Sequence, residues 1–308
     1  MNLTSPSQVK AWCIEHDFHP NKVLGQNFLI DRNALEAIVD AGLEGFGVSG
    51  FQSSEVSGLP GAEVLEIGPG LGVLTEEMLR RGVKVTAIEK DPVLAARLSE
   101  SLGNPPNLTV IADDALVWLA RLNTQPSTLN PQPSTLNPQP STLNSQPSTL
   151  NSQPSFSCMV SNLPYQAGTR ILLELVKARK IPMMTVLVQT EVAERLAAGP
   201  GSKTRGLAGV WAQLDYDVKI VRKVSASCFW PRPEIGSTVV KLVRHDRNLG
   251  ISGEERDLFY RLTKKAFEHR RKQLGSIFKD LIQSTARAEE LSNEDWLTLV
   301  RELVNVNV

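Results

Sequence analysis

The sequence predicts an α/β fold, a doubly wound sheet of mostly parallel strands, with a small all-helical region at the C-terminal end. The first observation is a strand-like run, Glu63–Ile67, that leads directly into the glycine-rich turn Gly68–Gly72 and a helical stretch, Val73–Leu79. Strand, glycine-rich turn and helix form the first half of a doubly wound sheet. The second observation is that apolar residues recur at helical spacing, without strand signals, from about residue 246 onwards.

These patterns divide the chain into a Rossmann-like domain, residues 1–245, and a helical C-terminal domain, residues 246–308. The segment 123–155 interrupts the first domain with a seven-residue unit close to Gln-Pro-Ser-Thr-Leu-Asn-Pro. A proline in every repeat excludes a coiled coil, and the lack of charge and core residues predicts a disordered surface insertion. We interpret it as a neutral expansion, with a functional linker as the alternative.

Composition indicates a soluble protein, with 41% hydrophobic and 21% charged residues. The sequence lacks a signal-peptide pattern and any apolar run long enough for a membrane helix, so we expect a cytoplasmic protein without membrane association. The three cysteines lie far apart and the four histidines have no metal-ligand spacing, which predicts reduced thiols and no metal. A monomer is the default expectation.

Charge is distributed unevenly although the net charge is zero. Residues 1–160 hold 9 Lys and Arg against 16 Asp and Glu, whereas residues 161–308 hold 24 against 17. A basic C-terminal half is compatible with a phosphate-binding face, and an uneven solvated surface is the alternative.

The N-terminal region predicts a short helix over Ser7–His16, then a loop over Leu24–Ile30 that enters a second helix at Asp31. Asp31 is a plausible N-cap. The second helix should bury three apolar side chains on one face: Leu35, Ile38 and Val39. Residues 44–61 are rich in glycine and serine and predict a surface loop.

The next strand, Lys84–Ile88, ends at Glu89, about 20 residues after the glycine turn, where a carboxylate can accept hydrogen bonds from both ribose hydroxyls. Dehydrogenases use a G-x-G-x-x-G turn to bind a pyrophosphate. Here the pattern is Glu66-x-Gly68-x-Gly70-x-Gly72, with an acid at the strand end. That acid suits an ammonium group, so we favour S-adenosylmethionine over NAD.

A third strand, Leu108–Ala112, follows a helix that begins at Asp91 and Pro92. It ends in two acids, Asp113 and Asp114. We assign Asp114 to the adenine amino group of the cofactor, with Asp113 as a helix cap.

The fourth strand, Cys158–Val160, breaks into the loop Asn162-Leu163-Pro164-Tyr165. Pro164 disfavours a helix at Leu163, so the loop should leave an amide and a backbone carbonyl available. Asn162 and the Pro164 carbonyl could accept both N–H bonds of a planar amino base, with Tyr165 against its face. An ordinary strand-end turn is the alternative reading of these residues taken alone.

Beyond this loop we expect further helices and strands, and a candidate base-flanking aromatic, Phe229, within Cys228–Pro233. Core packing is the alternative for Phe229 and its neighbour Trp230. The expected elements are helices over Thr169–Lys180, Glu191–Ala198, Leu207–Leu214 and Asn293–Val304, and strands over Met183–Gln189, Val218–Val224 and Ser237–Val243.

Basic residues in two places could contact phosphates. One is the loop Gly199–Gly206, with Lys203 and Arg205, and the other is the run Arg270-Arg271-Lys272 in the helical tail. Apolar residues of this tail should share inward faces: Leu258, Leu262, Ala266 and Phe267, then Leu274, Ile277, Phe278 and Leu281.

Together these motifs resemble the KsgA-type ribosomal RNA adenine dimethyltransferases, relatives of the Erm resistance methylases and of mitochondrial transcription factor B. The matching pieces follow the family's order over nearly the whole chain: Leu24–Leu29, Glu66–Gly72, Glu89, Asp114-Ala115, Asn162–Tyr165, Gly199–Gly206, Phe229–Ser237 and Arg270–Lys272. Two departures are Gln166-Ala167-Gly168-Thr169 after the loop and the insertion at 123–155.

The resemblance implies that S-adenosylmethionine contacts Asn27, Leu29, Gly68, Glu89, Asp114 and Asn162, and the reading of the glycine turn adds Gly70. It implies that residues 162–165 hold the target adenine and that the helical tail binds small-subunit rRNA of a pre-30S particle. The expected reaction adds two methyl groups to N6 of each of two adjacent adenines in a 3′-terminal hairpin of 16S rRNA.

Three alternatives stay open. An Erm-type enzyme acting on 23S rRNA would share the chemistry, and a DNA adenine methylase would share the Asn-Pro-Tyr type of loop. A non-catalytic nucleic-acid factor on the same fold would not need an intact Asn162 loop or Glu89.

Overall fold

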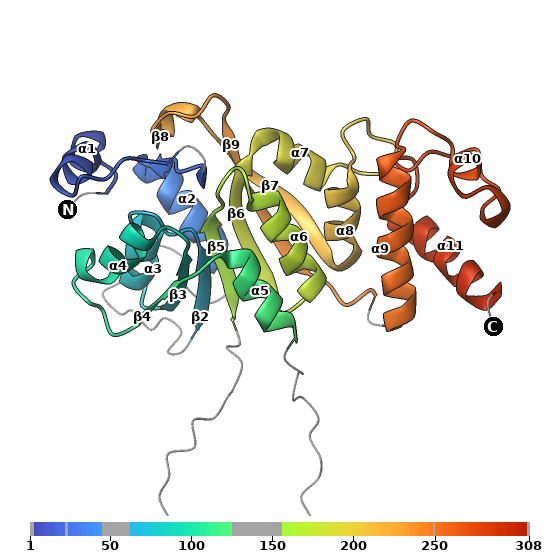
Figure 1. Cartoon of the computed structure of the whole chain (residues 1–308), viewed down its shortest axis with the longest axis horizontal. Helices are drawn as coiled ribbons and strands as arrows, with labels where there is room; N and C mark the ends of the chain where they lie inside the picture. Colours follow the sequence, from blue (N-terminus) through green and yellow to red (C-terminus); the bar gives the residue numbers. More distant parts are fainter. Residues whose placement is uncertain (1–2, 22–23, 45–61, 125–155, 249, 307–308) are drawn as a thin grey trace, which may run out of the picture.

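A computed structural model describes residues 3–21, 24–44, 62–124, 156–248 and 250–306. Its centre is a seven-stranded sheet in the order β4-β3-β2-β5-β6-β9-β7 (Figure 1). The first five strands in this order are parallel, while β9 is antiparallel to both of its neighbours. The strands are β2 Glu63–Ile67, β3 Lys84–Glu89, β4 Leu108–Ala112, β5 Cys158–Asn162, β6 Met183–Gln189, β7 Tyr216–Val224 and β9 Ser237–Arg244.

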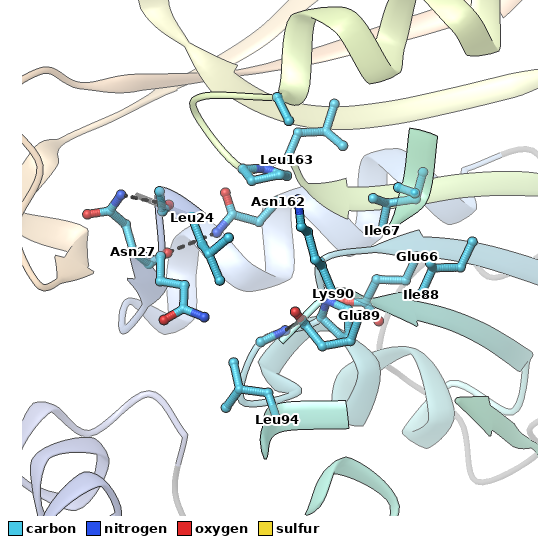
Figure 2. Close-up of a pocket in the computed structure, with 18 of the residues that line it drawn as sticks. Leu24, Asn27, Glu66, Ile67, Ile88, Glu89, Lys90, Leu94, Asn162 and Leu163 are labelled. Atoms are coloured by element: carbon cyan, nitrogen blue, oxygen red, sulfur yellow. Dashed lines mark hydrogen bonds between the residues drawn. The ribbon is translucent and has the colours of Figure 1, made fainter. Parts of the chain in front are cut away.

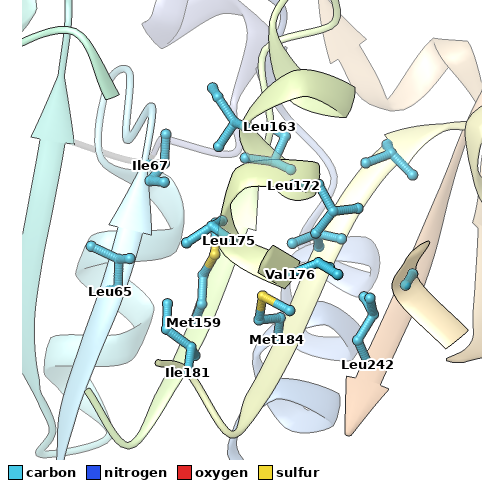
Figure 3. Close-up of a cluster of buried hydrophobic side chains, with 14 of the residues drawn as sticks. Leu65, Ile67, Met159, Leu163, Leu172, Leu175, Val176, Ile181, Met184 and Leu242 are labelled. Atoms are coloured by element: carbon cyan, nitrogen blue, oxygen red, sulfur yellow. The ribbon is translucent and has the colours of Figure 1, made fainter. Parts of the chain in front are cut away.

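Helices cover both faces of this sheet. Successive strand residues point to opposite faces, so Leu65 and Met159 lie on one side while Val64 and Val160 lie on the other. The first side packs on α5 to α8 and the second on α2 to α4. Figure 3 shows part of the first core, with Leu172 and Leu175 of α6 beside Met159. The helices are α2 Arg32–Leu43, α3 Val73–Arg80, α4 Pro92–Ser101, α5 Ala115–Thr124, α6 Gly168–Ala178, α7 Thr190–Ala197 and α8 Leu207–Asp215.

The strand order reverses between β2 and β5. From β2 the chain builds outward through β3 and β4, and then returns to place β5 and β6 on the other side of β2. In open α/β sheets, ligands bind at such a switch point, beyond the carboxyl ends of the strands. The fold therefore places its binding site next to the residues that follow β2, β3, β4 and β5.

An N-terminal segment lies against this end of the sheet. Helix α1, Pro6–Glu15, packs through Trp12 onto a small core that includes Phe28 and Leu71. Strand β1, Phe28–Leu29, then pairs antiparallel with β8, Phe229–Trp230. Two segments from opposite ends of the first domain thus meet beside the glycine-rich turn.

The C-terminal helices are α9 Gly253–Glu268, α10 Leu274–Phe278 and α11 Asn293–Val306, at the opposite end of the molecule from α1 (Figure 1). Their core includes the fully buried Trp296 and also takes in Val210, Trp211 and Leu214 of α8. The boundary at 245/246 stays a prediction, since this core reaches back across it.

Most predicted elements are confirmed to within a few residues, including the Asp31 cap, whose carboxylate accepts from Ala34 N at 2.7 Å. One prediction was wrong: Leu281 is 64% exposed and does not join the helical core. Helix α5 extends through Asn123 and Thr124, which the sequence pattern places in the insertion. The rest of that insertion, residues 125–155, and the loop expected at 44–61 beyond Glu44 lie outside the described residues. Among the described residues, no helix is both long and apolar enough to span a membrane.

Candidate active site

A cavity of about 330 Å³ lies at the switch point (Figure 2). Its wall combines the residues after β2, β3, β4 and β5 with the N-terminal segment 24–29. The volume falls within the range of small-molecule sites. The cavity brings together the predicted cofactor and base-binding residues: Asn27, Leu29, Gly68, Gly70, Glu89, Asp114, Asn162, Leu163, Pro164 and Tyr165.

Asn162 is the last residue of β5 and reaches across to the N-terminal segment. Its Nδ2 donates to the main-chain carbonyl of Asn27 at 3.2 Å, and the two residues lie side by side in Figure 2. Its Oδ1 is buried and has no hydrogen-bond partner among the described residues. Buried polar atoms are normally paired, so this oxygen is an acceptor available to a ligand donor.

The loop after Asn162 offers backbone carbonyls, but not as the sequence predicted. The Pro164 carbonyl accepts a hydrogen bond from Gly168 N at 2.7 Å, so it has one remaining lone pair and is tied to the start of α6. The carbonyl of Leu163 accepts no backbone bond from the described residues. Two acceptors besides Asn162 Oδ1 are therefore present in this loop.

Gly168, within the departure at residues 166–169, packs closely against the loop. Helix α6 begins at Gly168, and a Cβ there would lie 3.0 Å from the Leu163 Cβ. Glycine thus permits the helix to start directly behind the loop.

Tyr165 lines the cavity and is held from behind by β9. Its hydroxyl lies 2.6 Å from Ser237 Oγ, and Ser237 is fully buried. Burial raises the pKa of Tyr165, so the phenol is neutral and hydrogen-bonded. The ring is placed at the cavity wall, as a base-stacking role requires.

Phe229 does not fit its predicted role. It is 2% exposed, pairs with Leu29 across β1 and β8, and packs in the core with α2 and α3. It is not part of the cavity wall. A ring enclosed by core side chains cannot stack on an incoming base, so the core-packing alternative is correct for Phe229.

Glu89 and the glycine turn form a single unit. Oε2 of Glu89 accepts from Gly70 N at 3.0 Å, and Oε1 accepts from Asp91 N at 2.8 Å. Gly68 and Gly70 both have a positive φ, which glycine adopts without strain. Burial raises the pKa of Glu89, while these backbone donors oppose that rise. Each oxygen still has a lone pair for a ligand hydroxyl.

Glu66 is the strand-end acid that the sequence pattern matches to an ammonium group. It is 1% exposed, lines the cavity, and accepts a hydrogen bond from Thr75 Oγ1 at 2.6 Å. Burial raises its pKa to about 8, with a smaller contribution from the nearby Glu89. A strongly raised carboxyl pKa in a cavity marks a functional candidate.

Asp114 and Asp113 both line the cavity after β4. Asp114 Oδ1 accepts from Leu116 N at 2.8 Å, so Asp114 caps α5, the role predicted for Asp113. Its Oδ2 forms an ion pair with Lys90 at 2.8 Å, and this contact lowers the pKa of Asp114. Lys90, which the sequence did not single out, thus orients the acid expected to contact the cofactor.

The N-terminal segment fits closely against the loop 162–165. Gly25 has φ of +68°, and a Cβ there would lie 3.2 Å from the backbone nitrogen of Tyr165. Asn27 Nδ2 holds the same turn by donating to the Gly25 carbonyl at 3.1 Å. Leu29 is 1% exposed and lies between the cavity and the core. Gln26, missed by the sequence analysis, donates to Asp91 at 2.8 Å.

The two predicted phosphate-binding segments are adjacent in the structure. Arg270 donates to the carbonyl of Lys203, which joins the helical tail to the loop 199–206. Lys203, Arg271 and Lys272 are exposed. Arg205 is 1% exposed and bonded internally, so the prediction that it contacts phosphate was wrong.

Comparison with known proteins connects this geometry to a family. The model of the family described as ribosomal RNA adenine dimethylase matches residues 17–305. The chain belongs to the ribosomal RNA adenine dimethylase family. The match covers nearly the whole length, so both the sheet and the helical tail are family features.

Curated relatives of this dimethylase are similar over most of their length. "Ribosomal RNA small subunit methyltransferase A" of Alkaliphilus oremlandii is 35% identical, over 88% of this chain and 82% of the relative. The protein of the same name from Moorella thermoacetica is 34% identical, over 98% of this chain and 99% of the relative. The family predicted from the motifs, and the class of methyl-transferring enzyme, are confirmed.

Solved structures confirm the predicted fold. A dimethyladenosine transferase from Plasmodium falciparum matches with a TM-score of 0.64 and 20% identity, covering 91% of this chain and 98% of the other. The 23S rRNA methyltransferase ErmE matches with a TM-score of 0.57 and 23% identity, covering 90% and 100%. The described residues of the dimethylase contain no cluster of three or more side chains that could bind a metal ion.

Proposed function

We propose that this dimethylase uses S-adenosylmethionine to methylate N6 of adenine in small-subunit rRNA. The relatives' names, which specify the small subunit, support this target, and we take it to be 16S rRNA within a pre-30S particle. Each of two adjacent adenines in a 3′-terminal hairpin would receive two methyl groups. The cofactor, the substrate and the site roles given below belong to this proposal.

The observation that carries the proposal is the state of the Asn162 amide. Its nitrogen is anchored on Asn27 and its buried oxygen accepts nothing from the described residues. An adenine N6 amine carries two N–H donors, and the Asn162 loop offers Oδ1 and backbone carbonyls as acceptors. An unpaired acceptor at the carboxyl end of a central strand fits an amino group better than it fits a carbonyl or a phosphate.

The loop would activate the amine by the way in which it positions its hydrogen-bond acceptors. The N6 lone pair of adenine is delocalised into the ring, which makes the amine a weak nucleophile. Hydrogen bonds to Asn162 Oδ1 and to a carbonyl of Leu163 or Pro164 favour a pyramidal nitrogen with a localised lone pair. Positioning and electrostatics supply the catalytic effect without a strong base. The base must leave its stack to enter the cavity, where Tyr165 can lie against its face.

The residues at the other end of the cavity fit S-adenosylmethionine. The buried Glu66 carboxyl suits an ammonium group, because a cation would satisfy the charge that burial disfavours. Glu89 retains lone pairs for ribose hydroxyls, and Asp114 follows the third strand, where an adenine amino group is expected. The bound cofactor supplies an electrophilic methyl group on a sulfonium.

RNA would be held by Lys203, Arg270, Arg271 and Lys272. These cations belong to neighbouring segments of the loop 199–206 and the helical tail. Each contact that neutralises a phosphate releases counterions, so affinity should fall steeply with salt. Cytoplasmic location, the absence of a membrane partner and a monomeric state belong to the same proposal.

The test is methyl transfer from tritiated S-adenosylmethionine to three substrates side by side: undermethylated small subunits, large subunits and duplex DNA. We expect label in small subunits alone, released as N6,N6-dimethyladenosine after digestion. Label in large subunits would favour an Erm-type enzyme, and label in DNA a DNA adenine methylase. Binding to small subunits without any label would favour a non-catalytic factor.

A further inference from the structure

Arg205 is a buried cation with no acidic partner among the described residues. Its side chain is 1% exposed, and its guanidinium donates to neutral oxygens: Ala198 O at 2.9 Å, Gln213 Oε1 at 3.1 Å and Asn293 Oδ1 at 3.2 Å. Its Nε has no partner among the same residues. Burying an unpaired charge costs several kcal/mol, so the arrangement is costly for stability alone.

The C-terminal end of α7 partly compensates this charge. Ala198 is the C-cap of α7, where the unpaired carbonyls carry a partial negative charge. Gln213 of α8 binds the same carbonyl and also Leu196 O, and thereby fixes the acceptor group. Arg205, near the end of the loop 199–206, is therefore hydrogen-bonded to the C-terminal end of α7, where the loop begins.

The same guanidinium reaches the C-terminal helices. Its third acceptor, Asn293, is the first residue of α11, and Asn293 Nδ2 donates to Val210 O in α8 at 3.0 Å. Two further bonds tie the loop to this region: Gly201 N donates to Glu289 O at 2.8 Å, and Arg270 donates to Lys203 O. The loop is thus attached at its tip and at its base.

We propose that Arg205 is a positioning residue that holds the loop 199–206 and the helical tail in one fixed phosphate-binding surface. The exposed cations Lys203, Arg271 and Lys272 then meet an RNA backbone as one preformed set. Arg205 acts through its planar fork, which joins α7, α8 and α11, and it touches no phosphate itself. The proposal rests on the RNA-binding role proposed above.

Substitutions of Arg205 can distinguish a positioning role from a direct phosphate contact. A direct contact depends on charge, so Arg205→Lys would preserve it while Arg205→Met would remove it. A brace depends on three directed hydrogen bonds, and a lysine ammonium cannot reproduce the planar fork. We therefore expect both substitutions to weaken binding to undermethylated small subunits by a similar factor, roughly tenfold if one or two phosphate contacts are lost.

The experiment measures affinity for small subunits against salt concentration for the full-length wild type, Arg205→Lys, Arg205→Met and Lys203→Ala. Lys203→Ala calibrates the salt slope for one lost cation. Affinity for S-adenosylmethionine, by calorimetry, should be the same in wild type and both Arg205 variants, since Arg205 does not line the cavity. Hydrogen exchange of a peptide spanning 199–206 should be faster in both variants, because the Gly201 amide loses its fixed acceptor.

The proposal would be overturned if Arg205→Lys bound small subunits as tightly as the wild type and its 199–206 peptide exchanged hydrogen at the wild-type rate. Such a result would mean that the positive charge of residue 205 is sufficient. If Arg205→Met does not fold, Asn293→Ala removes the Arg205 link to α11 together with the Asn293–Val210 bond, and it should also weaken RNA binding. Unchanged binding in Asn293→Ala would then contradict the brace. Failure of the proposed function is distinguished by the wild type, which would neither bind nor methylate small subunits.

Discussion

The side-chain amide of Asn162 donates to the main-chain carbonyl of Asn27, a residue 135 positions earlier, at 3.2 Å. This bond sets which end of the amide is anchored and which is free, so Oδ1 is the buried atom without a partner among the described residues. The N-terminal segment that lines the cavity therefore also orients the Asn162 amide.

Replacing Asn162 should abolish methyl transfer while leaving RNA binding largely intact. Asn162→Ala removes the free acceptor, and loss of one positioned electrostatic partner typically lowers kcat about 10²- to 10³-fold. Single-turnover transfer to small subunits gives the rate, and filter binding gives the RNA affinity. A rate near that of the wild type would remove Asn162 from its proposed role.

The fit between Gly25 and the loop predicts a second effect. Gly25→Ala adds a Cβ at 3.2 Å from Tyr165 N, on a residue with φ of +68°. The displaced turn should withdraw the Asn27 carbonyl from Asn162 and lower kcat. Gly103→Ala is the matched control, since Gly103 has φ of +80° but no atom within 4 Å of the added carbon. Equal loss of activity in both variants would attribute the effect to backbone strain alone.

The Tyr165–Ser237 bond predicts non-additive effects. Tyr165→Phe and Ser237→Ala each remove the same hydrogen bond, which contributes about 0.5–1.5 kcal/mol. Each variant should therefore lower kcat/KM by up to about tenfold, and the double variant should lose no more than the larger single effect. Ser237→Thr, which keeps a hydroxyl, should retain more activity than Ser237→Ala. Fully additive losses would show that the two hydroxyls act separately.

Glu66 predicts a pH dependence of stability. Its pKa is raised from 4.5 to about 8 by burial, so the folded chain binds this proton more tightly than the unfolded chain does. The resulting stabilisation is complete below pH 4.5 and is lost as the pH rises through about 8. Glu66→Gln, which mimics the protonated acid, should be more stable than the wild type at high pH, by a margin that shrinks as the pH falls towards the unfolded pKa.

The free energy of unfolding of the cofactor-free protein, measured by urea titration at several pH values, checks this prediction. A constant difference between wild type and Glu66→Gln across the range would contradict it. If the cofactor ammonium lies beside Glu66, binding near neutral pH should also release a proton, which calorimetry in two buffers detects. Glu66→Gln should lose that release, whereas a proton from Glu89 would persist.

Removing most of the repeat insertion should leave the activity unchanged. Loop-closure entropy depends only weakly on length, so replacing residues 125–152 by a short Gly-Ser linker should leave methyl transfer unchanged. Transfer to small subunits and thermal unfolding of the shortened chain test this. A large loss of activity with an intact fold would favour the functional-linker alternative.

Local patterns in the sequence were sufficient for the glycine turn, Glu89 and the strand before Asn162, because neighbouring residues specify a strand, a tight turn or a cap. They were insufficient for Phe229 and Arg205. An aromatic next to prolines and an arginine in a polar loop look like ligand contacts in sequence, and only their burial excludes those roles.

By itself, the sequence determined the fold class, the order of strands and helices, and the motifs that identify the family, since these depend on periodicity and short-range spacing. The tertiary structure decided how distant residues act on one another. It paired Asn162 with Asn27 and Tyr165 with Ser237, and it turned Arg205 inward to join α7, α8 and α11. Such pairings depend on strand order and helix packing, which bring together residues whose separation along the chain carries no local signal.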